Sequence, residues 1–491
     1  MKKYFIAFMA VLFLCGCQQA PEKEAVTSKN NGVFQERVDQ TQPFGEAHSS
    51  LQMHWVEEFS STDGSVNFSV NIDQELSEDV TQVIEVKPHR LTEADIQRVA
   101  SLLLEDAVFY DRQPSTSPRY SKSQYQEKMR RLSPYTNMEA LTSLMGASDA
   151  NTYMEFIQLY METWTKAYET APDNAPRHLC DWTLKKERMY NDSEVEIGDR
   201  PFEDDCDVLY ANAQKNGIEY IFSVFSSDTK TYKLNRINLN LTEGIGLLPV
   251  DMAIYRSMLC RTEKPTEAQV NAVTAKAEDL LRRMELGQWD VIETEIETQQ
   301  IGDSVEYTVH VRAAPVLNGV SVLYGQPTSF FQDDYKPTYL MTKAEFIFSA
   351  NGDIIFFDMC SPMDIVETRN TNVQVLPLEE LFEKARQHLS FSDADAYGFP
   401  ARLRNRIEKS SEEHILCNVN ISQANYCLGR VSVPESDDHY YYIPILALYG
   451  TAEYIGENTG TIHFYNSSGE ADEDIPPLVC INAVDGSIIQ Q

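Results

Sequence analysis

The chain has 491 residues, of which 41 are Lys or Arg and 75 are Asp or Glu, so its formal net charge is -34 at pH 7. Such an acidic body is repelled by phosphate backbones and by anionic lipid headgroups, which excludes nucleic acid as an expected partner. The length exceeds what one hydrophobic core usually organises, and we expect at least two domains.

Residues 1–17 have the pattern of a lipoprotein signal peptide. Lys2 and Lys3 precede an apolar run, 4–14, which at about 11 residues is too short to cross a hydrocarbon core of roughly 30 Å. The tetrad Leu14-Cys15-Gly16-Cys17 then matches a lipobox, because a small residue stands directly before a cysteine. We therefore expect Cys17 to carry the lipid, diacylglycerol and palmitate, at the mature amino terminus. The alternatives are an ordinary signal peptide cut elsewhere and a short amphipathic anchor.

A lipid on Cys17 would place the protein on the extracytoplasmic face of the cell membrane. No later segment offers 18 consecutive apolar residues, so we expect an anchored chain and not a spanning one. Residues 18–47 are polar and contain Pro, Asn and Gly, a composition typical of a flexible linker.

An N-terminal α+β domain is expected over 48–262. Asp63-Gly64 separates two strand-like runs, 54–60 and 65–72, and Asp-Gly between such runs is typical of a hairpin. A third strand is expected over 80–86, and Thr92-Glu93-Ala94-Asp95 resembles a capping box that opens a helix. Further helices are expected over 120–132, 138–145 and 151–168, followed by strands over 219–225 and 231–241.

The helix over 151–168 carries a stripe of large apolar residues. Phe156, Leu159, Tyr160 and Trp164 recur at a helical spacing. Aromatic residues at this spacing are more often core than ligand-binding, so we expect this stripe to be buried.

After a boundary near 262 the chain repeats one arrangement. The first unit, 263–375, has a helix over 267–286, strands over 290–298 and 305–313, and a hairpin turned by Asn351-Gly352. The second unit, 376–491, has a helix over 378–389, strands over 414–421, 426–433 and 440–448, and a hairpin turned by Asp485-Gly486. Each unit is expected to be a helix that covers one face of an antiparallel meander, which makes the chain an α+β protein.

The C-terminal hairpin carries a resemblance to a known group. Its sequence, Asn482-Ala483-Val484-Asp485-Gly486-Ser487-Ile488-Ile489, follows the strand Tyr442-Ile443-Pro444 and the pair Tyr449-Gly450. This ending resembles lipoproteins of unknown function from gut clostridia, and over 266–491 the chain is more loosely similar to PepSY-like and YycH/YycI-like extracytoplasmic domains. The looser resemblance implies inhibition of proteases or modulation of envelope sensors, and it brings no catalytic residues.

Seven cysteines remain beyond the lipobox, an odd number that is too sparse for a disulfide framework. Cys417 and Cys427 are symmetric about Ser422 in an expected hairpin, which makes them the candidate disulfide. Buried free thiols are the alternative, since no C-x-x-C pair predicts a zinc site.

Catalytic and metal motifs are few. Ser227-Asp228-Thr229-Lys230 matches Ser-x-x-Lys, but that chemistry needs the serine at a helix start, and this tetrad falls between strand-like runs. His178, Cys180 and Asp181 could ligate a metal, but a fourth ligand is missing. Acidic runs over 203–207 and 470–474 lack the spacing of a calcium loop and are expected to be solvated surface. We predict no catalytic residue, no metal and no cofactor.

The densest aromatic patch is Tyr440-Tyr441-Tyr442. Alternate residues of a strand face opposite sides, so one face of this patch could bind sugar or peptide, although tyrosines that close a sheet edge are the more ordinary interpretation.

The sequence therefore predicts a non-catalytic, lipid-anchored envelope protein that binds or regulates a protein or peptide partner. Two alternatives stay open. The first is an envelope hydrolase of peptidoglycan or glycan with an unrecognised site, and the second is a solute-binding lipoprotein with a cleft between doubly wound domains.

Overall fold

A computed structural model describes most of the chain. The described residues are 36–39, 51–76, 80–111, 120–145, 147–174, 178–189, 204–228, 233–241, 256, 258–260, 263–301, 304–324, 342–391, 415–433, 436, 438–456, 462–467 and 477–489. Cys17 and the acidic run over 470–474 lie outside them. No helix within these ranges is both long enough and apolar enough to cross a membrane.

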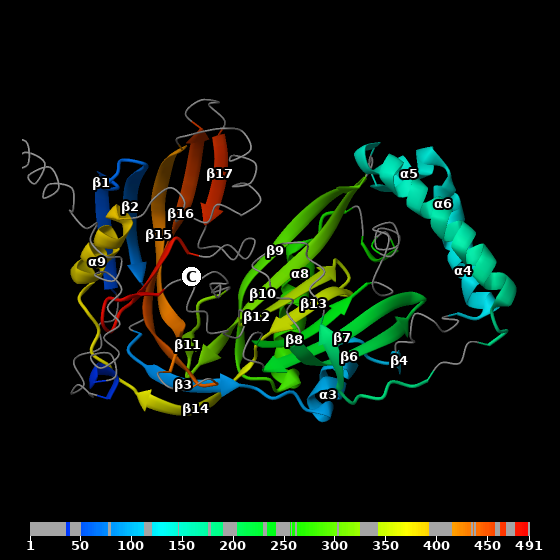
Figure 1. Cartoon of the computed structure of the whole chain (residues 1–491), viewed down its shortest axis with the longest axis horizontal. Helices are drawn as coiled ribbons and strands as arrows, with labels where there is room; N and C mark the ends of the chain where they lie inside the picture. The colour runs from blue at the N-terminus through cyan, green and yellow to red at the C-terminus, as the bar shows by residue number, and fades with distance from the viewer. Residues whose placement is uncertain are drawn as a thin grey trace, which may run out of the picture.

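The protein is a mixed α+β structure with two large sheets, as the sequence predicts (Figure 1). The nine-stranded sheet consists of β1 (Leu51–Ser60), β2 (Val66–Leu76), β3 (Val83–Pro88), β14 (Met363–Asn370), β15 (Ile415–Ser432), β16 (Tyr440–Gly456), β17 (Ile462–Ser467), β18 (Val479–Asn482) and β19 (Ile488–Ile489). The ten-stranded sheet consists of β4 (Val108–Asp111), β5 (Lys185–Met189), β6 (Asp204–Lys215), β7 (Ile218–Asp228), β8 (Lys233–Asn240), β9 (Trp289–Ile301), β10 (Ser304–Leu317), β11 (Val320–Ser321), β12 (Lys343–Ser349) and β13 (Ile354–Cys360).

The described helices are α3 (Glu93–Leu103), α4 (Lys122–Leu132), α5 (Met138–Met145), α6 (Ala147–Thr170), α8 (Glu267–Met284) and α9 (Leu378–Ser390), with a short 3₁₀ helix at Ser133–Thr136. The capping box expected at the start of α3 is present, since Thr92 accepts from the backbone of Asp95 and Asp95 accepts from the backbone of Thr92.

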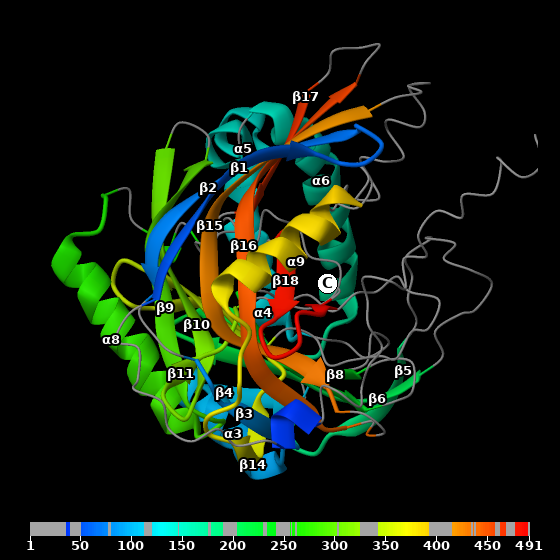
Figure 2. The ribbon, with the colours of Figure 1, turned by 90° about the vertical axis from the view of Figure 1, so that its left-hand side faces the viewer.

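Both arrangements of a helix followed by an antiparallel meander are present, as the sequence predicts. After α8 the strands β9, β10, β12 and β13 pair antiparallel in that order, and Val273, Ala277 and Leu280 of α8 enter the core of this sheet. After α9 the order is β15, β16, β18 and β19, and α9 lies across the face of this sheet (Figure 2). The helix residues buried there are Leu381, Ala385 and Leu389.

The two sheets divide the chain differently from the domains expected from the sequence, which were 48–262, 263–375 and 376–491. Strands β1 to β3 belong to the nine-stranded sheet, together with the C-terminal strands. β2 pairs parallel with β15, and Val66 lies opposite Cys417. Strands β4 to β8 extend the other sheet, where Leu239 of β8 lies opposite Phe357 of β13. The alternation of apolar residues identifies a strand but not its partner, so pairing between distant parts of the chain was not predicted.

Helices α4, α5 and α6 pack around a small core of their own, which includes Leu132, Leu141 and Ile157. Trp164 is buried there, as expected, whereas Phe156 and Leu159 of the same stripe are 44% and 57% exposed. The inner face of α6 is set by Met154, Ile157 and Trp164, which are three and seven residues apart and so lie on one side of the helix.

Candidate functional site

The structure places Cys417 and Cys427 on one continuous strand, β15, where the sequence predicts a hairpin. Ten residues of extended strand separate them by roughly 33 Å, and a disulfide requires Cα atoms within about 7 Å. Neither thiol forms a disulfide, and both residues are buried. A β-bulge between Ile421 and Gln423 supplies the irregularity that the sequence presented as a turn.

The other residues singled out in the sequence do not form a site among the described residues, and Thr229 and Lys230 lie outside these. Ser227 is a buried residue of β7 and does not begin a helix. Cys180 is held beside β4, where its backbone donates to the carbonyl oxygen of Phe109. Burial, with the negative charges of Asp111 and Asp181, raises the pKa of Cys180 to about 12, which opposes metal binding by its thiolate.

Tyr440, Tyr441 and Tyr442 are all buried, with 1–3% of their surfaces exposed. Tyr440 and Tyr442 face the core that contains α9, while Tyr441 faces a second core with Ile443 and Cys427. Both faces of the strand are covered at this point, so these tyrosines offer no open binding surface.

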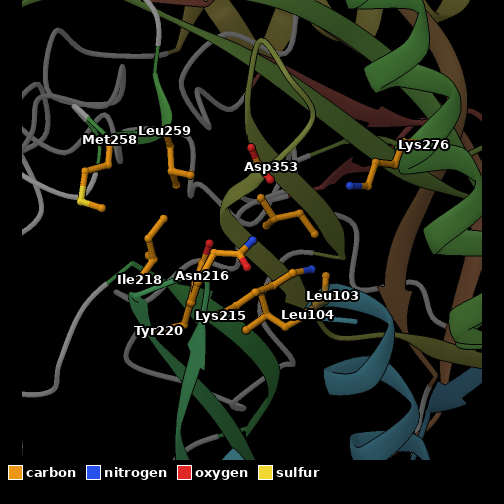
Figure 3. Close-up of a pocket in the computed structure, with 11 residues that line it drawn as sticks. Leu103, Leu104, Lys215, Asn216, Ile218, Tyr220, Met258, Leu259, Lys276 and Asp353 are labelled. Atoms are coloured by element: carbon orange, nitrogen blue, oxygen red, sulfur yellow. The ribbon is translucent and has the colours of Figure 1, made fainter. Parts of the chain in front are cut away.

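A pocket of about 220 Å³ lies where α3, α8 and two hairpin turns meet (Figure 3). In the first turn Asn216 and Gly217 both have positive φ, which closes the hairpin between β6 and β7 as a type I′ turn. In the second turn Gly352 has φ of 82° between β12 and β13. We call this site the α3–α8 pocket. Its lining residues are Leu103, Leu104, Lys215, Asn216, Ile218, Tyr220, Met258, Leu259, Lys276, Asp353 and Ile354.

The charged groups of the α3–α8 pocket come from three elements. Lys215 ends β6, Lys276 projects from α8, and Asp353 leaves the turn between β12 and β13 (Figure 3). The ammonium group of Lys276 donates to the carbonyl oxygen of Gly352 at 2.7 Å. Burial lowers the pKa of Lys276, and Lys215 lowers it further, while Asp353 opposes both. The pocket therefore carries two cationic groups beside one carboxylate.

The remaining walls of the α3–α8 pocket are mostly apolar. Leu103 and Leu104 are buried, whereas Met258 is 54% exposed and lies at an open side. Burial and the charge of Asp353 raise the pKa of Tyr220, so its phenol stays protonated. The volume is below the 300–1,000 Å³ of typical drug-sized ligand sites. It suits one small group, such as a carboxylate with a short apolar neighbour.

Sequence reasoning did not find this pocket. The turns Asn216-Gly217 and Asn351-Gly352 carry the local signal of hairpins. The two hairpins, β6 with β7 and β12 with β13, lie far apart in the chain. Only the packing of α8 against the sheet brings Lys276 to Asp353 and Lys215, and no local pattern in the sequence encodes that packing.

A second group of polar side chains lies on one face of β9 and β10. Arg312 of β10 lies opposite Glu293 of β9, and its Nη1 donates to Glu293 at 2.8 Å and to Glu295 at 2.7 Å. Desolvation opposes the charge of Arg312, but the hydrogen bonds from both carboxylates outweigh it and raise its pKa. Glu293, Glu295 and Glu297 alternate along β9, which places them on the same face.

His310 lies two residues before Arg312 on this face and directly opposite Glu295. Only 7% of its surface is exposed. Among the described residues, His310 with Glu295 and Glu297 is the group whose ligand atoms lie within 4.8 Å of one another, close enough to hold one metal ion. The period-two run of glutamates was visible in the sequence, but the histidine that completes the group comes from the next strand.

Fold and sites define the protein as a mixed α+β chain with two helix-covered sheets, a small charged pocket and a cluster of glutamates around one buried histidine. No family model and no curated protein matches it. A solved structure that resembles it is an uncharacterized protein from the gut clostridium Eubacterium rectale ATCC 33656, at 9% identity and a TM-score of 0.35, with 94% of this chain and 98% of that chain covered. This likeness assigns no family.

Proposed function

We propose that the protein is a non-catalytic, lipid-anchored member of the cell envelope that binds a peptide or protein partner outside the membrane. In this proposal the α3–α8 pocket receives a carboxylate of the partner. The observation that carries the proposal is the convergence of Lys215 and Lys276 on one pocket in a chain of net charge -34.

The charges indicate what such a partner would look like. The acidic body attracts cationic segments over a long range and repels anionic ones. A carboxylate is favoured locally, because two ammonium groups face the pocket and only one carboxylate opposes them. A basic peptide with a free C-terminal carboxylate satisfies both conditions, and capture of a chain end is a known mode of peptide recognition.

The hydrolase alternative has less support at this pocket. Hydrolysis of a glycosidic bond generally uses a pair of carboxyl groups that flank the bond, and the described lining residues include one, Asp353. The solute-binding alternative expects doubly wound parallel sheets. In the described residues the strand pairs are antiparallel except for β2 with β15.

The test compares short basic peptides that differ only at their C-terminus, one series with a free carboxylate and one amidated. We expect the free series to bind more tightly to the wild-type protein, and Lys276→Met to remove most of that preference. Lys166→Met is the matched control, since Lys166 is an exposed helical lysine paired with Glu162 and far from the pocket in sequence. Equal binding of both series would contradict the proposed pocket, and turnover of a peptidoglycan fragment would favour the hydrolase.

A further inference from the structure

Three ligand-type side chains meet across two neighbouring strands. Glu295 and Glu297 project from β9, and His310 projects from the same face of β10, opposite Glu295. The diagonal neighbour of His310 is Glu297, and His310 Nδ1 lies 2.8 Å from Glu297 Oε1.

The two ring nitrogens of His310 differ in their partners. Nε2 lies 3.1 Å from the hydroxyl of Thr308, whereas Nδ1 is buried and makes no hydrogen bond with any described residue. When Nε2 carries the proton and donates to Thr308, the lone pair of Nδ1 faces a carboxylate oxygen. Two acceptors at this separation repel each other unless a proton or a metal ion lies between them.

The charges around the histidine leave room for a divalent ion. Among the described residues, Arg312 contacts all three glutamates of β9, at 2.7–3.7 Å. The carboxylates of β9 therefore outnumber the guanidinium that they share. Neighbouring charges form pairs of their own, Arg256 with Glu306 at 3.7 Å and Lys343 with Glu345 at 3.7 Å.

We propose that Glu295, Glu297 and His310 bind one divalent transition-metal ion, with Zn²⁺ as the best fit. One imidazole and two carboxylates are ligands that Zn²⁺ accepts at about 2.0–2.2 Å, and three protein ligands leave a position for water. The imidazole favours Zn²⁺ over Ca²⁺ and Mg²⁺, which prefer oxygen. Glu297 has a side chain that is 44% exposed and gives the ion a path from solvent. Arg312 remains bound to Glu293 and orients the glutamates from outside the ligand set.

This site goes beyond the proposed binding function and does not depend on it. The experiment uses the full chain without an affinity tag, stripped with a chelator and titrated with Zn²⁺ against a chromophoric zinc indicator. We expect one tight Zn²⁺ per chain. We expect His310→Gln and Glu297→Gln each to weaken binding by at least tenfold. His54→Gln is the matched control, because His54 lies 3.6 Å from Asp73 but both side chains are 67% exposed.

Three results would overturn the proposal. The first is a wild-type protein that binds no stoichiometric Zn²⁺. The second is unchanged affinity in both His310→Gln and Glu297→Gln. The third is Ca²⁺ that competes as well as Zn²⁺ while His310→Gln has no effect, which would indicate carboxylates alone. If His310→Gln does not fold, Glu297→Gln carries the test, and the proposal then requires that Zn²⁺ raise the melting temperature of the wild type but not of Glu297→Gln.

Discussion

Arg369 of β14 donates a hydrogen bond to Glu85 of β3, with 2.7 Å between Arg369 Nε and Glu85 Oε2. The other oxygen of Glu85 lies 2.5 Å from His439 Nδ1, just before β16 begins. Glu85 is 6% exposed, so one buried carboxylate joins three parts of the chain that lie far apart in sequence. β3 and β14 thereby attach to β16 through side chains as well as through the backbone.

Glu85→Gln should destabilise the fold at neutral pH. Burial alone would raise the pKa of Glu85, but its hydrogen bonds with His439 and Arg369 outweigh burial and lower it. Hydrogen bonds to a charged partner are each worth about 1.5–3 kcal/mol. We expect the free energy of unfolding in urea at pH 7 to fall by about 2 kcal/mol in the variant.

The same carboxylate predicts a pH dependence. A lowered folded pKa gives stability that is fully present above the unfolded value, about 4.3, and is lost as the pH falls through the folded value. The difference in unfolding free energy between wild type and Glu85→Gln should therefore shrink from pH 6 to pH 3. Other acidic groups affect both proteins alike, so a difference that stays constant over this range would contradict the assignment.

A glycine of β16 faces a backbone that cannot move aside. A Cβ on Gly450 would overlap the carbonyl oxygen of Asn420, next to the bulge in β15. We expect Gly450→Ala to lower the free energy of unfolding by more than the roughly 1–3 kcal/mol typical of overpacking. Gly429→Ala is the comparison, since the three atoms nearest to its added Cβ belong to the side chain of Ile445 and not to the backbone, and its melting temperature should fall less. An equal or larger loss of stability in Gly429→Ala would show that the backbone at the bulge can move to accommodate the added Cβ.

These strands show how far the sequence predicts the fold. Asp63-Gly64 and Asn351-Gly352 each lie in a hairpin turn where expected, because a glycine at positive φ is a local requirement of such turns. β3 pairs with both β14 and β16, and Glu85 of β3 contacts Arg369 and His439, but these partners lie far away in sequence and no local pattern identifies them.

The sequence likewise predicts only the local part of each candidate site. The alternating glutamates of β9 can be read from the sequence, but His310 lies beyond a turn and its register decides which glutamate it meets. The sequence predicts a turn at Ser422 between Cys417 and Cys427, whereas the structure has a bulge there and one continuous strand. A bulge and a turn use similar residues, so spacing between cysteines could not separate them.

Cys417 and Cys427 should not form a disulfide with each other. Their separation along β15 prevents a bond between them, and burial raises the pKa of Cys427, which slows its reaction in the folded state. Native protein treated with iodoacetamide should leave both unmodified. After unfolding in guanidinium without a reductant, mass spectrometry should find both fully alkylated. A peptide pair linked through Cys417 and Cys427 would contradict the continuous strand.

The lipid anchor predicted at Cys17 can be tested against its neighbour in the lipobox. Cys17→Ser removes the acceptor thiol, so incorporation of labelled palmitate should stop and the protein should leave the membrane fraction. Cys15→Ser keeps Leu14, Gly16 and Cys17 in place and should be labelled like the wild type. Each buried CH₂ contributes about 0.8 kcal/mol to membrane binding, so two or three acyl chains hold the protein where one would release it. Equal labelling of Cys17→Ser, or cytosolic protein with its first 16 residues intact, would remove the basis for an extracytoplasmic role.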